Sequence, residues 1–181
     1  RYNKRVWNVT EINEEKKSVT YGMLSPDGEK GFPGNYTGYV TYELTEANEI
    51  VLHYEGSADM DTVVNMTNHS YFNLAGHKAG AEAMLNHVVQ IFAPEYTPVS
   101  DSEAIPTGEI LPVKGTPMDF TKPKTIGQDV EADFEQLKLL GGYDHNYALC
   151  REKGELQQAA KIVCKESGIE MEVFTDLPGM Q

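Results

Sequence analysis

Apolar and polar residues alternate along much of this chain with a period of two. Apolar side chains occupy every second position in Val40–Leu44, Ile50–Tyr54 and Ile169–Val173. Alternation of this kind places one face of a strand on a core and the other toward water, so each stretch predicts an antiparallel strand. Two shorter runs rich in β-branched residues, Val63–Met66 and Val88–Phe92, predict further strands.

Turn residues separate these stretches, and helical periodicity is scarce. Turn-forming clusters stand at Ser25–Gly28, Pro33–Asn35 and Ser167–Gly168. The spacing of Phe134, Leu137 and Leu140 predicts one short helix, and Ala79–Leu85 is a candidate for a second. Many short strands with frequent turns are typical of an all-β sandwich or barrel.

The stretch Ala93–Val130 is rich in proline and glycine but keeps apolar residues. We interpret it as a long ordered loop that lies over one sheet. The residues expected to anchor it are Ile105, Ile110, Leu111 and Phe120.

The net charge of the chain limits the classes of molecule that it is expected to bind. The chain has 181 residues, with 15 Lys and Arg against 28 Asp and Glu, which gives a formal net charge of -13. Nucleic acids and anionic membranes are bound through clustered basic residues, so neither is expected as a partner. No apolar run approaches the roughly 20 residues of a membrane span, and no signal peptide is visible.

Cysteine and histidine spacing gives no sign of a metal site. Cys150 and Cys164 match no C-x-x-C pattern, and we expect each to be a structural thiol in a strand. The five histidines show no H-x-x-x-H spacing, so no metal is expected.

The segment Asn65–Leu74 is the most unusual in composition. It contains three asparagines, one histidine and two aromatic residues directly after an apolar run. Asparagine and histidine supply directional hydrogen bonds, and aromatic rings supply flat apolar faces. This mixture suits a sugar, which carries hydroxyls at its edge and C–H groups on its faces. A polar turn around a hydrogen-bonded histidine is the alternative, and residue types alone favour it.

A second polar cluster follows a pair of glycines at Gly141 and Gly142. The glycines permit a tight backbone path before Asp144, whose carboxylate is suited to accept hydrogen bonds from neighbouring sugar hydroxyls. An exposed hairpin turn explains the same residues equally well.

Taken together and in order, these motifs resemble the aldose 1-epimerases, also called galactose mutarotases. The segment Asn65–Leu74 is similar to a signature of that family, and so is the loop Ser25–Asn35. Three more matches follow in the same order and at similar separations, at Ile105–Glu109, Gly142–Tyr147 and Pro178–Gln181. Five ordered matches cover nearly the whole chain.

The resemblance implies a large antiparallel β-sandwich, present here as an incomplete piece. On this interpretation residues 1–181 are the central part of a single mutarotase-like domain that is truncated at both ends. The implied activity is that of an isomerase, an aldose 1-epimerase, which interconverts the α and β anomers of free hexoses such as glucose and galactose. The implied chemistry is acid and base catalysis of ring opening and reclosure, and it requires no cofactor.

The resemblance also assigns site residues. His69 is the implied catalytic acid, which protonates the ring oxygen, and an imidazole suits this because its ordinary pKa is about 6.5. Ser70 and Tyr71 flank it in the implied sugar pocket, and Asp144 and Gln181 are the implied hydroxyl-binding groups. The family's catalytic base is a glutamate beyond the segment that matches Pro178–Gln181, so it is expected outside this chain.

Two alternatives remain. A hexose-6-phosphate 1-epimerase would need several basic residues for the phosphate, and the arginines are only Arg1, Arg5 and Arg151. A non-catalytic carbohydrate-binding module of the same fold is the other. The expected partner is a small sugar, and we expect a cytoplasmic monomer or weak dimer.

Overall fold

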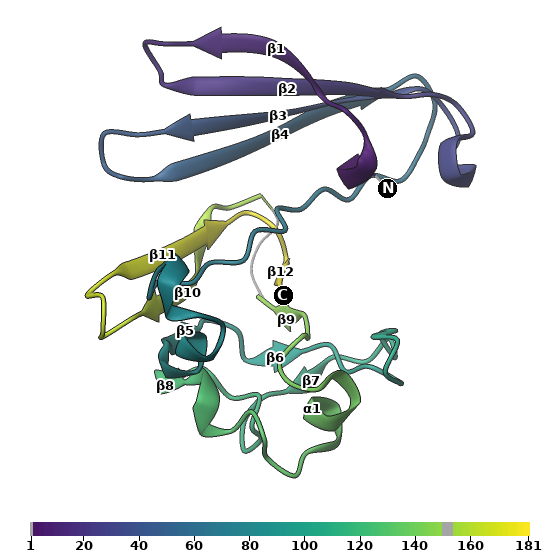
Figure 1. Cartoon of the computed structure of the whole chain (residues 1–181). Helices are drawn as coiled ribbons and strands as arrows, with labels where there is room; N and C mark the ends of the chain where they lie inside the picture. Colours follow the sequence, from purple (N-terminus) through teal and green to yellow (C-terminus); the bar gives the residue numbers. More distant parts are fainter. Residues whose placement is uncertain (1, 150–153) are drawn as a thin grey trace. The chain divides into compact units, whose positions relative to one another are not determined.

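The computed structural model describes residues 2–149 and 154–181, which form two compact units. The first unit ends at Ser70 and the second begins at Tyr71. Figure 1 labels the strands of both units and the helix α1. Strands dominate, and every strand pairing in the described residues is antiparallel. The prediction of an all-β antiparallel fold is therefore confirmed.

Unit 1 is one four-stranded meander in the order β1-β2-β3-β4. Short turns join β1 to β2 and β3 to β4, whereas a longer loop that contains η2 joins β2 to β3. Long continuous registers tie β3 to both β2 and β4. The elements are η1 (Tyr2–Lys4), β1 (Asn8–Asn13), β2 (Ser18–Ser25), η2 (Glu29–Gly31), β3 (Tyr36–Leu44) and β4 (Ile50–Ala58).

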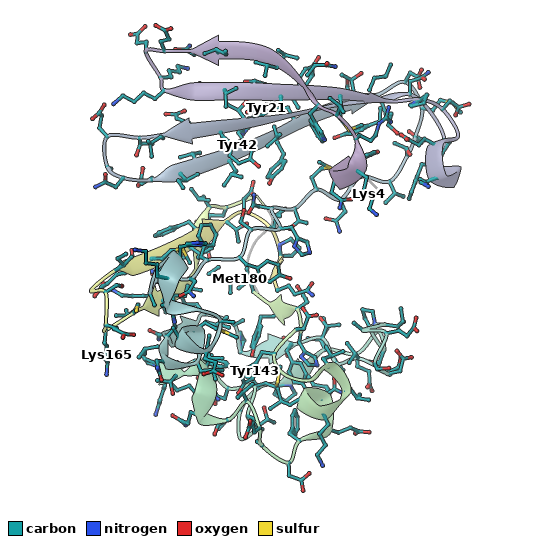
Figure 2. The ribbon with its side chains drawn as sticks, in the orientation of Figure 1. Lys4, Tyr21, Tyr42, Tyr143, Lys165 and Met180 are labelled. Atoms are coloured by element: carbon teal, nitrogen blue, oxygen red, sulfur yellow. The ribbon has the colours of Figure 1, made fainter. Side chains whose placement is uncertain are left out.

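The alternation in β3 gives this sheet an apolar and a polar face. Tyr36 and Val40 are buried on the apolar face, whereas Tyr42 and Leu44 farther along it remain 37% and 54% exposed. Figure 2 shows Tyr42 on β3 and Tyr21 on the neighbouring β2, whose rings meet edge to face at 6.3 Å. The predicted period of two is therefore correct, but burial is confined to the first half of the strand.

The Tyr36 ring requires glycine on two strands. A Cβ on Gly56 would lie 2.3 Å from the Tyr36 hydroxyl, and one on Gly38 would lie 2.7 Å from its ring. Tyr2 stacks on the same ring, with centroids 6.1 Å apart and planes 13° from parallel. The two glycines thus let an aromatic ring lie against the sheet backbone.

Unit 2 contains two four-stranded antiparallel sheets, in the orders β11-β10-β5-β8 and β12-β9-β6-β7. Helical elements are short. The elements are η3 (His77–Ala79), η4 (Glu82–Asn86), β5 (Val88–Ile91), β6 (Glu95–Tyr96), β7 (Leu111–Pro112), β8 (Lys124–Thr125), η5 (Ile126–Gln128), α1 (Glu135–Leu140), β9 (Tyr147–Ala148), β10 (Gln157–Val163), β11 (Glu170–Thr175) and β12 (Gly179–Met180).

Side chains from both sheets form one core, so unit 2 is built like a sandwich. Ile91 and Ala160 come from one sheet, and Tyr96 and Tyr147 from the other. Met118 is fully buried among them, and Phe120 meets Tyr147 edge to face at 6.4 Å. In β11 the exposed and half-buried residues alternate as the sequence predicts.

The connecting segments were predicted less well than the strands. Val63–Met66 forms no strand: Val63 is 75% exposed, and the chain leaves the sheet after Ala58. Ala79–Leu85 lies in two short 3-10 helices instead of one α-helix. The helix predicted around Leu137 is confirmed as α1.

In the stretch Ala93–Val130 only one of the four expected anchors is correct. Phe120 is buried, whereas Ile105, Ile110 and Leu111 are 56%, 57% and 37% exposed. The other buried residues of this stretch are instead Ala93, Tyr96, Pro98, Val99, Val113 and Met118.

The cysteine prediction is tested at one position. Cys164 is buried with a free thiol, and it directly follows β10 instead of lying within a strand. Cys150 lies outside the described residues.

Candidate functional site

Asp144 and Gln181 lie together in unit 2. The Gln181 side-chain amide donates a hydrogen bond of 2.8 Å to the Asp144 carboxylate, across 37 residues of sequence. Both residues are exposed, so the remaining oxygens of the pair are open to a ligand. A carboxylate accepts through about four lone-pair sites, and an amide both donates and accepts. The pair therefore offers the groups that hydroxyl-rich molecules require.

The pairing of β9 with β12 brings Gln181 to this position. Gly179 pairs with Ala148 and Met180 with Tyr147, and the Leu149 amide donates to the Pro178 carbonyl at 2.9 Å. Gly179 is required here, because a Cβ on it would lie 2.3 Å from the Asn146 side-chain oxygen. The Pro-Gly turn thus places Gln181 beside the start of β9, close to Asp144, which precedes that strand.

The end of helix α1 fixes the backbone that leads to Asp144. It ends at Leu140 and is capped by Gly141, which adopts the left-handed conformation with φ 68°, and the Gly142 amide donates to the Leu137 carbonyl at 2.9 Å. Left-handed backbone at this position favours glycine. The predicted role of the glycine pair in a tight backbone path is consistent with this geometry.

His145, next to Asp144, points into the core. Its Nε2 lies 3.2 Å from the side-chain oxygen of Gln136, which also accepts from the Val99 amide at 2.7 Å. The Gln136 amide nitrogen donates back to the Val99 carbonyl at 3.0 Å. The Tyr96 ring packs edge to face on the imidazole at 5.9 Å. This network fixes the backbone beside Asp144, and burial lowers the pKa of His145.

His69 and Ser70 are the last residues of unit 1 and belong to an irregular segment. Both side chains are exposed. The Asn68 side chain accepts the Ser70 amide at 3.0 Å, which closes a local turn around His69, and the Thr67 hydroxyl donates to the Asn68 carbonyl at 3.2 Å. The local turn presents the imidazole to solvent instead of burying it.

Tyr71 opens unit 2 with its side chain 87% exposed, and the residues after it are firmly anchored. The Leu74 amide donates to Nε2 of His87 at 2.9 Å, and His87 Nδ1 pairs with the Ala83 carbonyl at 3.1 Å. His87 is buried, and these two bonds fix its tautomer as Nδ1–H. The exposed aromatic residues Tyr71 and Phe72 thus lie just before Leu74, whose backbone is held by His87.

The loop Ser25–Asn35 in unit 1 is ordered by side-chain hydrogen bonds. Asp27 accepts from the Gly34 amide at 2.7 Å, and Asn35 donates to Asp59 twice, each time at 2.7 Å. Glu29 accepts from Ser25 and pairs with Arg5, and the Ser25 hydrogen bond is the main cause of its lowered pKa.

Residues 2–149 and 154–181 contain no cluster of three or more His, Cys, Asp or Glu side chains with the geometry of a metal site. Within the same ranges no helix is long and apolar enough to cross a membrane.

Comparison with known families gives a match over nearly the whole chain. The family described as aldose 1-epimerase matches residues 2–181. This chain belongs to the aldose 1-epimerase family.

Relatives in this family include galactose mutarotase from Sus scrofa, which is 40% identical over 180 residues, or 99% of this chain and 49% of the relative. Aldose 1-epimerase from Escherichia coli (strain K12) is 37% identical over 99% of this chain and 50% of that protein. The chain therefore spans about half the length of these relatives.

Solved structures support the fold. The galactose 1-epimerase from Lactobacillus acidophilus NCFM superposes with a TM-score of 0.74 at 32% identity, over 87% of this chain and 45% of the other. An aldose epimerase homologue from C. elegans, at 24% identity, shares the fold with a TM-score of 0.76. The predicted mutarotase-like β-sandwich architecture is thus confirmed.

For a chain of the aldose 1-epimerase family, the structure adds positioning residues that the sequence did not reveal. His87 and the His145–Gln136 pair fix the backbone beside the predicted site residues, although none of them was singled out. Only the proximity of His145 to Asp144 in sequence could have drawn attention to it. The structure brings Asp144 and Gln181 together within unit 2, and it places His69 and Ser70 on an exposed turn of unit 1.

Proposed function

We propose that this chain carries part of the active site of an aldose 1-epimerase acting on free hexoses such as glucose and galactose. The observation that carries the proposal is the Gln181–Asp144 hydrogen bond. It joins the exposed polar residues of two separate family motifs. Membership of the aldose 1-epimerase family supports the same reaction class.

The reaction requires one acid and one base. The base takes the proton of the C1 hydroxyl while the acid protonates the ring oxygen, and the bond between C1 and the ring oxygen breaks to leave an open-chain aldehyde. Rotation about the C1–C2 bond presents the other carbonyl face. Reclosure with the two roles reversed returns both protons and gives the other anomer. No electrons leave the sugar, so the step balances without an oxidant or cofactor.

His69 is the proposed acid. An imidazole both gives and takes a proton near neutral pH, as a reversible reaction requires. Its exposed position on the Asn68 turn supports this role, because a proton donor must reach solvent and substrate. Ser70 and Tyr71, also exposed, are proposed to contact the sugar beside it.

Asp144 and Gln181 are proposed to bind sugar hydroxyls. The carboxylate accepts from two neighbouring hydroxyls, and the amide of Gln181 holds it in one orientation at 2.8 Å. Hydrogen bonds to an ionised group are stronger than those between neutral groups. The pair therefore orients the ring but does not transfer its protons.

The proposed catalytic base is a glutamate of the full-length protein outside the matched span. The relatives are about twice as long as this chain, which leaves room for it. On the same basis we propose that residues 1–181 are the central part of a single mutarotase-like domain.

A phosphorylated sugar is disfavoured as substrate by the negative charge of the proposed site, and several basic residues are already paired with carboxylates. Arg5 pairs with Glu29, Lys124 with Asp129 at 2.7 Å, and Lys161 with Glu170 at 2.8 Å. Asp144, the proposed ligand for hydroxyls, would repel a phosphate brought close to it.

We also propose a cytoplasmic monomer or weak dimer. The free thiol of Cys164 is consistent with a reducing compartment. The excess of acidic over basic residues favours solubility and keeps copies apart at low salt.

Polarimetry tests the proposed activity. The full-length protein is added to freshly dissolved α-D-galactose, α-D-glucose or α-D-glucose 6-phosphate, and optical rotation is followed against the uncatalysed rate. Faster equilibration of the free sugars supports the proposal. Catalysis of the phosphorylated sugar alone would support the 6-phosphate epimerase, whereas sugar binding without acceleration would support the non-catalytic module.

A further inference from the structure

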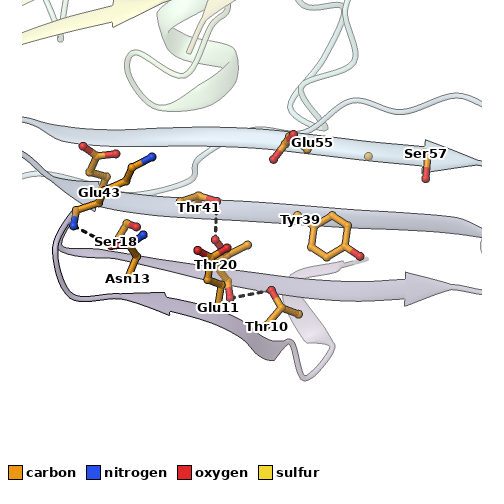
Figure 3. A pocket seen from close by; sticks show the side chains of 12 residues that line it. Thr10, Glu11, Asn13, Ser18, Thr20, Tyr39, Thr41, Glu43, Glu55 and Ser57 are labelled. Carbon is orange, nitrogen blue, oxygen red and sulfur yellow. Dashed lines mark hydrogen bonds between the residues drawn. The ribbon is translucent and has the colours of Figure 1, made fainter.

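The polar face of the unit 1 sheet contains a hollow of about 680 Å³ that takes no part in the proposed reaction. Its floor is made by side chains of all four strands, which Figure 3 shows from close by. We call this hollow the polar groove. Among the residues that line it are Thr10, Thr20, Tyr39, Thr41, Glu43 and Glu55.

The alternation of the strands places hydroxyl groups in a row across this groove. Thr20 pairs with Thr41 in the β2–β3 register, and their hydroxyls are hydrogen-bonded at 2.8 Å. The Thr10 hydroxyl donates to the Thr20 carbonyl at 3.2 Å. Rotatable hydroxyls that both donate and accept are suited to hydroxyl-bearing ligands.

Tyr39 supplies a flat aromatic surface in the same groove. It pairs with Gly22 on β2, and a Cβ on Gly22 would lie 2.9 Å from Cε1 and 3.0 Å from Cδ1 of its ring. The ring therefore lies against the backbone where glycine leaves space, with the side chain of Thr10 beside it. The residue is still 38% exposed, and in Figure 3 its ring stands among the polar side chains.

The charge of the groove limits the kind of ligand. Glu11, Glu43 and Glu55 outnumber the single lysine that lines it, Lys16. An acidic surface disfavours phosphorylated or sulfated ligands and nucleic acids. A neutral molecule with many hydroxyls meets no such repulsion.

The groove is also longer than one sugar ring. Tyr39, Thr41 and Glu43 lie on one face of β3, and four residues of strand cover about 13 Å at the usual rise per residue. Such a length exceeds a single hexose ring and suits a short chain of sugars.

We propose that the polar groove is a second carbohydrate site, which binds a short neutral oligosaccharide. Tyr39 stacks on the C–H face of one sugar ring, Thr20 and Thr41 exchange hydrogen bonds with its hydroxyls, and Glu43 and Glu55 accept from further hydroxyls. This site lies wholly in unit 1 and does not depend on the proposed activity.

The test uses methyl β-cellobioside, which has no free anomeric hydroxyl and cannot be epimerised. Binding is measured by NMR titration of the full-length protein, with D-galactose added in excess to occupy a monosaccharide site. The expected result is binding that galactose does not displace, with magnetisation transfer between the sugar C–H groups and the ring protons of Tyr39. This readout requires no variant.

Tyr39→Ala and Tyr42→Ala form a matched pair of variants. Both tyrosines lie on β3 and are equally exposed, at 38% and 37%, but Tyr42 is on the opposite face. Tyr39→Ala is expected to weaken binding about tenfold or more, the equivalent of about 1.4 kcal/mol, while Tyr42→Ala leaves it unchanged. Equal effects of the two variants, displacement by galactose, or no binding at all would each overturn the proposal.

Discussion

Gln181 holds the Asp144 carboxylate by a hydrogen bond of 2.8 Å between residues that are 37 positions apart in the sequence. Neither residue is buried, so burial does not explain why they meet. The short pairing of β9 with β12 and the absence of a side chain at Gly179 bring them together. A strand pairing of two residues therefore determines the geometry of the proposed hydroxyl-binding pair.

Replacing Asp144 by asparagine should weaken sugar binding and leave the fold intact. The change keeps the shape of the side chain but removes its charge, and a hydrogen bond to a charged group contributes about 1.5–3 kcal/mol. We therefore expect galactose binding by the full-length protein to fall by about 10- to 150-fold. Isothermal titration calorimetry measures it. Asp176→Asn, at another exposed carboxylate of unit 2, is the control and should bind normally. Unchanged affinity in Asp144→Asn would make Asp144 a structural residue.

Replacing His69 by alanine should slow anomer interconversion by about 10²- to 10⁴-fold, the usual contribution of a general acid. Because the side chain is exposed, the thermal stability of the protein should be unaffected. Polarimetry on freshly dissolved α-D-galactose provides the rate. The matched control is His77→Ala, at an exposed histidine in η3. A normal rate in His69→Ala would remove this residue from the proposed mechanism.

Strands could be predicted from the sequence because their signal is local. The alternation at Val40–Leu44 and Ile169–Val173 marks β3 and β11 directly, and periodicity at Leu137 marks α1. The family motifs also indicated Asp144 and Gln181 together, although the hydrogen bond between them depends on a strand pairing that no local pattern specifies.

Burial in the connecting segments could not be predicted, because it depends on contacts distant in sequence. Ile105 and Val113 lie in the same long stretch, but only Val113 reaches the core between the sheets. Val63 has the β-branched side chain of a strand residue, yet it follows the end of β4 and pairs with no strand of the described residues. His87 and His145 gain their roles only from partners that folding brings to them.

Replacing His87 by alanine should destabilise the protein. The buried imidazole accepts the Leu74 amide at 2.9 Å, and its loss leaves that amide without this acceptor. An unsatisfied buried donor costs about 1–3 kcal/mol. Urea unfolding followed by circular dichroism should therefore show a lower midpoint, with His77→Ala as the exposed control. Equal midpoints for the two variants would mean that another group or water replaces the imidazole without cost.

The stability of the protein should decrease as the pH is lowered, and part of this decrease should come from His145. Burial lowers the pKa of this imidazole below its ordinary 6.5, and the Asp144 carboxylate opposes the shift only in part. Between the lowered pKa and 6.5 the unfolded chain binds a proton that the folded chain does not. Stability from this group is therefore complete above pH 6.5 and is lost as the pH falls toward the folded-state pKa.

The variant His145→Gln isolates this contribution. Glutamine does not titrate and keeps a polar group near Gln136, so the free energy of unfolding of the variant should change less than that of the parent as the pH falls below 6.5. Urea titrations at a series of pH values measure both slopes. His77→Gln removes an exposed histidine and should retain the parent's slope. Parallel curves for the parent and His145→Gln would show that His145 binds its proton equally in both states, which contradicts the lowered pKa.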